Sequence, residues 1–533
     1  MNPFSSPAAS PYLEISAAPP APARKNLSHR TLLGTAGGLL SQGATLCTNL
    51  ILTPIIAGLL GQALFGVWTM INQINNYIAL GEFRVASVLK YQLAGLQHSA
   101  DFSHKRRLVG ASVVLLAVIL PLLVLSIFAA AWMSPSIFPG VHEHLPSIRW
   151  AMGISGAGML LMQVVSVPGG VMRGENLDYK AMWLRSSLVV LTSVVGLGLL
   201  FYGWGLIGLA VAVLLRQIIY TGVWQILACR HVAWYGVERP SRAEVSSAAR
   251  GSIWVFVSGL GFLALSTGDL ILAGIMLGPA AASTYYVTGA LLRFAMMPMG
   301  SLNAASGPGI AGLCGAGDWR RLGKVMNDYF LISQFYLAWI GAVALAVNAA
   351  FVISWMGPSY DGGHLLLALL LVGRVLLTQL EVDGNVLDGM LCFRQRAMVL
   401  AGSVGLALAV SVWAGHQWGL AGMAAGPLIG RVLTLVLFRR LIANAQPSLQ
   451  LGGMLRPRLL VVTVALWSLA WTSTELFQPI GWIAIAVNSA ITAVIAFVVL
   501  CFVGVGAADR ALVQARFGKL LHRFASPMRG RPS

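Results

Sequence analysis

Charged and amide side chains recur along one apolar stretch of this 533-residue chain. A charge at the centre of a membrane helix costs about 2.5–3.5 kcal/mol on insertion scales, so such residues face water or one another. Steps of four, three, four and three residues place them on one helix face, over roughly 21 Å. This polar stripe consists of Arg374, Thr378, Glu381, Asn385 and Asp388. It predicts a cavity lining or a buried network; the purely structural alternative is an Arg374–Glu381 ion pair that ties helices together.

A further acidic residue, Asp269, follows Gly268 inside another apolar run. A carboxylate in such a place can exchange a proton when no partner holds it charged. Its oxygens, with those of Glu381 or Asp388, can equally bind sodium. We therefore predict coupling to H+ or Na+, with no other cofactor and no metal centre; the alternative is that Asp269 only pairs with a nearby Arg. The predicted ion-coupling residues are Asp269, Glu381, Asp388, Asn385 and Thr378.

Basic residues form a second group of candidates. Arg carries a forked set of donors that matches the oxygens of a diphosphate. Arg216 and Arg431 take nearly equivalent positions, 12 and 13 residues after the Trp of two similar Trp-Gly-Leu segments, which favours a paired role. For every one of these cations, snorkelling to the cytoplasmic surface is the alternative. The predicted substrate-binding residues are Arg84, Lys90, Arg216, Arg293, Arg374 and Arg431.

The composition indicates where these residues must lie. Hydrophobic residues make up 57% of the chain and charged residues 10%, whereas a soluble protein carries about a quarter charged residues. The composition therefore indicates an integral membrane protein. The formal charge of +18 is explained by Lys and Arg in cytoplasmic loops rather than by a nucleic-acid partner. The five cysteines have no paired or metal-binding spacing, so neither disulfides nor a metal site is expected.

Apolar runs of about 20 residues, the length that crosses a bilayer, are the elements that must position the candidates. Lys and Arg gather in alternate loops, for example at Lys105–Arg107 and Arg320–Lys324, which predicts that both termini are cytoplasmic. The opposite loops leave no room for an extramembrane catalytic domain. The fourteen predicted spans cover residues 33–59, 65–95, 109–133, 150–171, 184–202, 206–228, 250–277, 280–312, 327–353, 364–390, 398–415, 418–438, 458–474 and 480–504.

Three pairs of similar segments indicate an internal repeat of about 215 residues. Six spans per repeat is an even number, so both copies share one orientation and are related by a pseudo-two-fold axis along the membrane normal. The predicted fold is an all-α polytopic membrane protein with two six-helix lobes and two extra C-terminal helices. The pairs are WGLIGLA (Trp204–Ala210) with WGLAGMA (Trp418–Ala424), LLGQALFGVW (Leu59–Trp68) with MLGPAAASTY (Met276–Tyr285), and VMRGENLDYKA (Val171–Ala181) with VLDGMLCFRQR (Val386–Arg396).

The spans and the repeat divide the chain. No cleavage pattern precedes the first apolar run, which favours an uncleaved first span over a signal peptide. The basic C-terminal tail can lie as an interfacial helix on the inner leaflet, with a solvated tail as the alternative. The expected divisions are a disordered cytoplasmic tail (1–30), an N-terminal six-helix lobe (31–230), a cytoplasmic inter-lobe linker (231–249), a C-terminal six-helix lobe (250–440), helices 13 and 14 (457–506) and a basic cytoplasmic tail (507–533).

Several of these motifs together resemble a known transporter family. LLGQALFGVW, the WGL turn and GDLILAGIMLGPAAASTYY (Gly268–Tyr286) are similar to the multidrug/oligosaccharidyl-lipid/polysaccharide exporter superfamily, and within it to the polysaccharide and O-antigen flippase branch. The resemblance runs over about residues 31–440. It departs near Glu82, where many relatives have an Asp, and at Ser283, where the family often keeps Gly.

The resemblance implies two lobes around a central cavity and transport by alternating access. The implied cargo is a polyprenyl-diphosphate-linked oligosaccharide, moved across the bacterial inner membrane for surface or exopolysaccharide assembly by counter-movement of protons or sodium. Membrane lipids, a polysaccharide polymerase and chain-length machinery are the further partners expected. The chain is thus expected to be a transporter and no enzyme.

Other functions stay open. A flippase for the lipid-linked peptidoglycan precursor and a cation-coupled drug exporter belong to the same superfamily, although a cationic interior argues against cationic drugs. A membrane glycosyltransferase or polymerase is less favoured, because the acidic residues of the outer loops, Glu143, Asp361 and Glu475, are isolated. The residues of the first repeat that match the polar stripe include no acid, so ion coupling is expected in the second lobe; they are Met159, Gln163, Ser166, Gly170 and Arg173.

Overall fold

The computed structural model of the chain is helical, and it contains no β-strand in the part of the chain that it describes. That part omits residues 1–23 of the predicted N-terminal tail and the whole predicted C-terminal tail, so these predictions lie outside the described residues. Residues 24–30, predicted to be disordered, are instead helical, because α1 begins at Arg24. The residues left out are 1–23, 81–84, 86–88, 91, 94–95, 97–100, 176, 178–179, 181, 450–455, 477–480 and 507–533.

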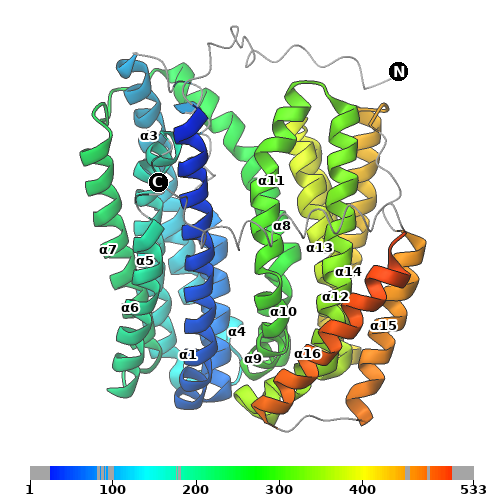
Figure 1. Cartoon of the computed structure of the whole chain (residues 1–533). Helices are drawn as coiled ribbons and strands as arrows, with labels where there is room; N and C mark the ends of the chain where they lie inside the picture. Colours follow the sequence, from blue (N-terminus) through cyan, green and yellow to red (C-terminus); the bar gives the residue numbers. More distant parts are fainter. Residues whose placement is uncertain are drawn as a thin grey trace, which may run out of the picture.

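The helices form two lobes that stand side by side (Figure 1). The N lobe contains α1 (Arg24–Leu80), α3 (Phe102–Trp132), α4 (Ser134–Ile137), η1 (His142–His144), α5 (Leu145–Gly174), α6 (Met182–Phe201) and α7 (Gly205–His231). The C lobe contains α8 (Arg242–Leu277), α9 (Pro279–Thr288), α10 (Ala290–Ala295), α11 (Met297–Gly315), α12 (Trp319–Met356), η3 (Pro358–Tyr360), α13 (Gly363–Gly389) and α14 (Phe393–Ala445). On its flank lie α15 (Pro457–Leu476), α16 (Trp482–Val499) and η4 (Leu500–Gly504).

Within the described ranges, nine helices are long and apolar enough to cross a membrane. This number is below the fourteen predicted spans for three reasons: two helices each contain two passes, one span is broken into three short helices, and α6 and α15 are not among the nine. α1 and α14 each contain two passes, separated by non-helical backbone at Gly61 and at Trp418–Gly419. α9, α10 and α11 stack into a single column (Figure 1). Counted in this way, each predicted span coincides with a helix, and the predicted fold class is confirmed.

Glycines with left-handed backbone lie at equivalent turns of the two lobes. Residues with a side chain rarely adopt left-handed backbone, so these turns require glycine at these positions. Their spacing repeats the offsets of 214 and 217 residues found in the sequence. The pairs are Gly61 and Gly278 (φ 76° and 94°), Gly140 and Gly357 (φ 80° and 101°), and Gly205 and Gly419 (φ 52° and 56°). The repeat is therefore present in the backbone as well as in the sequence.

The bundle has two ends of different character. The basic end is the one where α3, α8 and α12 begin, close to Lys105, Arg242 and Arg320. The far end is the one where α4, α9 and η3 lie; it is at the bottom of Figure 1. At the basic end the non-helical link 232–241 joins the lobes, and α8 crosses from the N lobe into the C lobe.

The two lobes pack against each other at the far end. Gln62 Nε2 donates to Thr284 Oγ1 at 3.0 Å and to Ser359 O at 2.8 Å, and so joins α1 to α9 and η3. A Cβ placed at Gly66 would lie 1.7 Å from Pro279 O. Only glycine permits helices to approach this closely. The far end is therefore closed.

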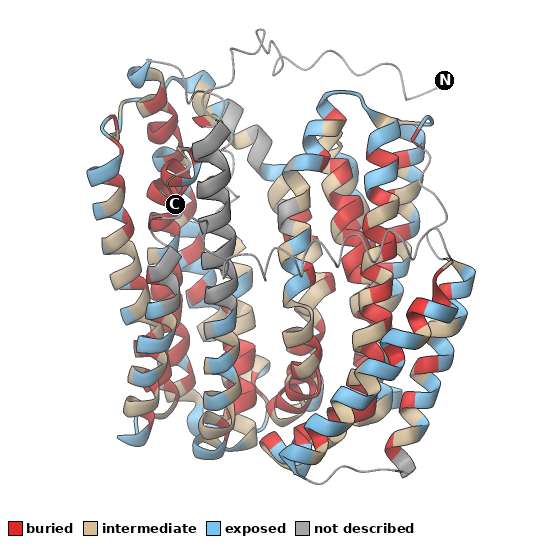
Figure 2. Ribbon diagram, viewed as in Figure 1, coloured by how far each residue is buried: buried red, intermediate tan, exposed pale blue. Residues whose placement is uncertain are grey.

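Burial follows the two-lobed plan. Buried residues occupy the helix faces that meet neighbouring helices, and exposed residues lie on the periphery (Figure 2). Exposed positions include many large apolar side chains, such as Ile483 at 82% exposure, as a lipid-facing surface requires. α15 and α16 pack on α12, where Trp467 Nε1 donates to Ala338 O and Trp339 Nε1 donates to Ala493 O. This pair of helices lies outside the repeat, as the sequence predicts.

Candidate functional site

Asp269 is buried between three helices of the C lobe. It lies on α8 nine residues before the turn at Gly278, and Tyr285 lies seven residues after that turn. The two side chains therefore meet across the hairpin, where Tyr285 Oη donates to Asp269 Oδ2 at 2.5 Å. Arg431 Nη2 of α14 lies 4.0 Å from the same oxygen. Asp269 is thus partnered from two sides, which corresponds to the pairing alternative that the sequence left open.

The Arg431 side chain is buried and bonds to other groups of the protein. Its side chain is 5% exposed, and its Nε and Nη2 both donate to Leu265 O, at 2.9 and 2.5 Å. A Cβ placed at Gly373 would lie 2.2 Å from Arg431 Nη1, so the guanidinium needs a glycine on α13. Arg431 therefore joins α8, α13 and α14.

Arg293 is held by the break between α9 and α10. Its Nη2 donates to Tyr286 O at 2.5 Å, and its Cζ lies 3.9 Å from the centroid of the Tyr286 ring. A cation this close to an aromatic face is attracted by the ring quadrupole. The break at Gly289 leaves room for Arg293 Nη1, which a Cβ there would approach to 3.0 Å. Arg293 is thus fixed in direction but only half-buried.

Arg374 differs from both neighbours. Its guanidinium makes no hydrogen bond and no ion pair with any residue that the structure describes, and it is half-buried. It lines a pocket of about 50 Å³ together with Arg293, Arg431 and Asp269. We call this space the arginine pocket. Three guanidinium groups face one carboxylate there, and that carboxylate is already bonded, so the pocket suits an anion.

A larger cavity of about 360 Å³ lies in the N lobe. Neutral hydrogen-bonding side chains dominate its wall, and no acidic residue occurs among the described residues that line it. It shares Gln73 and Tyr286 with the arginine pocket, so the two spaces adjoin where the lobes meet. We call it the amide cavity. Its polar lining is Thr48, Asn49, Thr53, Thr69, Asn72, Gln73, Asn76, Thr192, Ser193 and Arg216.

The middle of the polar stripe is bonded to α11. Asn303 Nδ2 donates to Glu381 Oε2 at 2.8 Å, and Asn385 Nδ2 donates to Asn303 Oδ1 at 2.9 Å. Thr378 Oγ1 donates to the Arg374 carbonyl at 3.0 Å. Arg374 and Glu381 form no ion pair with each other in the described structure. The stripe therefore lines a cavity at Arg374, and at Glu381 and Asn385 it forms a half-buried network centred on Asn303.

Two of the remaining candidates, Asp388 and Lys90, lie toward the basic end. Asp388 accepts hydrogen bonds from Arg396 at the start of α14, through both carboxylate oxygens. Its oxygens are therefore used in an ion pair on the protein's own surface. Lys90 lies near the end of α5, where a Cβ at Gly174 would be 3.4 Å from its carbonyl oxygen. It lines neither the arginine pocket nor the amide cavity. Arg84 lies outside the described residues.

Sequence reasoning missed five contributors to these sites. Asn72, Gln73 and Asn76 carry a signal that was available, since steps of one and three residues place amides on one side of an apolar helix. Tyr285 was recognised only as an aromatic residue after the turn at Gly278. Asn303 carries no signal of its own, because its role depends on how α11 packs against α13.

These features define a class: a multi-pass membrane protein with two lobes, built from an internal repeat around adjoining polar spaces. No family model matches the chain, and no curated protein matches it. Solved structures of MATE transporters do match. The chain is similar to an inward-facing multidrug resistance MATE family transporter of the MOP superfamily, with a TM-score of 0.61 at 16% identity over 79% of this chain and 96% of that one.

Two further structures agree with this fold. The eukaryotic MATE transporter AtDTX14 has a TM-score of 0.61 at 14% identity, with 84% of this chain and 99% of that chain covered. The MATE multidrug transporter DinF-BH has a TM-score of 0.59 at 16% identity, with 79% and 95% covered. The chain therefore has a MATE-like transporter fold.

Proposed function

We propose that the protein is a flippase that moves a polyprenyl-diphosphate-linked oligosaccharide across the bacterial inner membrane for surface polysaccharide assembly. One observation carries this proposal: the Arg374 guanidinium makes no hydrogen bond and no ion pair with the described residues, although it lies inside a membrane bundle beside Arg293 and Arg431. Glu381 acts on it only through a longer-range electrostatic interaction. A charge without a direct partner in such a place is costly. A diphosphate would supply the missing partner, with oxygens that match forked guanidinium donors.

The amide cavity supports the same cargo. Sugar hydroxyl groups both donate and accept hydrogen bonds, as the carboxamides of Asn72, Gln73 and Asn76 do. Trp68 and Tyr286 add aromatic surface to the same wall. Arg216 brings one cation to this cavity from α7. A hydrogen-bonding space with mostly neutral side chains, beside a cationic pocket, matches a cargo made of neutral sugars and an anionic diphosphate.

A cation-coupled drug exporter is the second candidate. The observation that favours it is the fold, since similar structures are described as multidrug transporters. A cationic drug needs a carboxylate that is available in the cavity. Asp269 is the carboxylate of the arginine pocket, and it is bonded to Tyr285 and faced by Arg431. We therefore rank this function below flipping. The lipid-linked peptidoglycan precursor shares the diphosphate chemistry and differs in its sugars.

Alternating access and ion coupling complete the proposal. Because Lys and Arg favour the cytoplasmic side of a membrane protein, we expect the basic end, and with it both termini, to be cytoplasmic. The closed far end then corresponds to an inward-facing state. The Asn303 network offers Glu381 as the group that exchanges H+ or Na+ with the cytoplasm. Protonation of Glu381 or Na+ binding there would break the bond from Asn303 and free α11 to move relative to α13.

The test compares two variants in cells that depend on this protein for surface polysaccharide. Arg374→Gln should lower export and cause lipid-linked oligosaccharide to accumulate in the inner leaflet. Arg320→Gln, at an exposed position in the first turn of α12, is the matched control and should change neither. Susceptibility to lipophilic cations should be the same in all strains. Normal export by Arg374→Gln together with a change in cation susceptibility would favour the drug exporter instead.

A further inference from the structure

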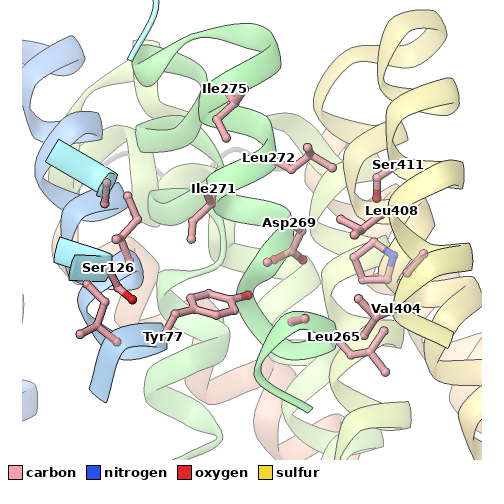
Figure 3. Close-up of a pocket in the computed structure, with 17 residues that line it drawn as sticks. Tyr77, Ser126, Leu265, Asp269, Ile271, Leu272, Ile275, Val404, Leu408 and Ser411 are labelled. Atoms are coloured by element: carbon pink, nitrogen blue, oxygen red, sulfur yellow. The ribbon is translucent and has the colours of Figure 1, made fainter. Parts of the chain in front are cut away.

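A groove of about 480 Å³ lies on the side of the molecule where the two lobes meet. We call it the lateral groove. Its wall comes from α1 and α3 of the N lobe and from α8 and α14 of the C lobe (Figure 3). The lining is almost wholly apolar and includes Ile74, Ala130, Ile271, Leu272, Val404 and Leu408. The groove is therefore suited to hydrocarbon.

The lateral groove opens toward lipid. Leu408 on its α14 wall is 47% exposed, and Ile275 on α8 is 37% exposed. Both lie in helices that are long and apolar enough to span the membrane. Exposed apolar side chains in such helices face acyl chains. A hydrocarbon chain can therefore enter this groove sideways from the bilayer.

The lateral groove and the arginine pocket share a wall. Asp269 lines both spaces. On α1, Gln73 lines the arginine pocket and Tyr77, one helical turn further on, lines the groove. Tyr77 and Asp269 point toward each other at the floor of the groove (Figure 3). Gly268 permits this approach, since a Cβ there would lie 3.0 Å from Tyr77 Oη.

We propose that the lateral groove holds the hydrocarbon chain of the cargo while the diphosphate occupies the arginine pocket, an inference that rests on the proposed function. An amphiphile with a long apolar chain and an anionic head needs two such spaces side by side, and they meet at Asp269. Because opposite walls of the groove belong to different lobes, a movement of the lobes changes its width. The chain can then remain in the bilayer as the head crosses.

A lipophilic cation is the other occupant that an apolar groove with a carboxylate on its floor could take. The surroundings of Asp269 disfavour it. The oxygen that accepts from Tyr285 is also 4.0 Å from Arg431 Nη2, and two more guanidinium groups line the adjoining pocket. A cation bound there would meet more positive than negative charge.

The test uses the full-length protein in nanodiscs of phosphatidylethanolamine and phosphatidylglycerol. The probes are a long-chain polyprenyl diphosphate and the short isopentenyl diphosphate. Leu408→Trp, which fills the groove, should weaken binding of the long probe by about tenfold and leave the short probe unchanged. Leu406→Trp, at an exposed α14 position outside the groove, should leave both affinities unchanged. Equal loss of both probes in Leu408→Trp, or an equal effect of Leu406→Trp, would overturn the assignment.

A second measurement needs no variant. A polyprenyl diphosphate with a photoreactive group in its chain should label peptides of α8 and α14 that line the groove, and tetraphenylphosphonium should not compete. Labelling confined to α15 and α16 would overturn the groove while leaving the proposed function intact. Failure of the wild-type protein to bind either diphosphate would instead contradict the proposed function, and the groove assignment with it.

Discussion

The amide cavity and the arginine pocket show how two copies of one scaffold have acquired different chemistry. Arg216 and Arg431 occupy nearly equivalent repeat positions, yet Arg216 lines a cavity of about 360 Å³ whereas Arg431 is buried and bonded to Leu265 O. The repeat positions of Asp269 and Arg293 are Leu52 and Asn76 in the N lobe, and both of these line the amide cavity. Equivalent surfaces therefore face the centre, neutral in one lobe and charged in the other.

The first prediction tests the contact between the two lobes at the far end, which keeps the neutral and the charged surface facing each other. Gly66→Val introduces side-chain atoms where a Cβ would already lie 1.7 Å from Pro279 O, so we expect the far end to open and transport to be lost. Gly58→Val on the same helix meets no atom within 4 Å and is the control. Distances between spin labels on the two lobes report the change. Unchanged label distances in Gly66→Val would show that the far-end contact does not control access.

The second prediction separates the two repeat-related arginines. Arg431→Gln removes a buried cation that joins three helices, so the free energy of unfolding should fall by about 3 kcal/mol. Arg216→Gln, at a half-buried position that lines the amide cavity, should lower stability by less than Arg431→Gln does and should lower transport instead. Thermal unfolding in detergent, with export measured in parallel, distinguishes the two. Equal stability losses would mean that the two positions have the same structural role.

The third prediction separates ion coupling from cargo binding. Glu381→Gln should abolish the dependence of transport on pH or sodium, because the Asn303 network loses its ionisable member. Asn72→Leu in the amide cavity should leave ion dependence unchanged and raise the KM for cargo by about tenfold, the equivalent of ~1.4 kcal/mol for lost hydrogen bonds. Transport in proteoliposomes at several pH values measures both. Ion dependence that survives in Glu381→Gln removes it from coupling.

The smallest expected effect concerns the link between the lobes. Burial tends to raise the pKa of Glu244, but hydrogen bonds from Ser241 and Arg107 outweigh it and hold that pKa below its ordinary value. A lowered pKa stabilises the folded state above about pH 4.5, and this contribution is lost as pH falls through the folded pKa. It should amount to at most about 1 kcal/mol. Glu244→Gln should remove this part of the pH dependence of the free energy of unfolding. An unaltered pH dependence in Glu244→Gln would mean that groups other than Glu244 cause it.

The sequence predicts the fold well because its signals are local. Apolar runs, alternating basic loops and repeat-related glycines such as Gly61 and Gly278 do not depend on packing. The site is predicted less completely because contacts between helices decide it. The spacing on α13 places Arg374 and Glu381 on one helix face. Only packing shows that Asn303 binds Glu381, while the Arg374 guanidinium makes no hydrogen bond and no ion pair with the described residues. In the same way, equivalent sequence positions do not reveal that Leu265 O engages Arg431.

The most direct test of the central claim is the affinity of the purified protein for a long-chain polyprenyl diphosphate, measured for wild type, Arg374→Gln and Arg320→Gln. Loss of the Arg374 guanidinium from the arginine pocket should weaken binding of the polyprenyl diphosphate by about 30-fold, or ~2 kcal/mol. The Arg320→Gln variant should bind it as the wild type does. Tetraphenylphosphonium should not compete. Equal affinity of Arg374→Gln and wild type, or displacement of the diphosphate by the cation, would contradict the proposal that the arginine pocket receives an anionic cargo.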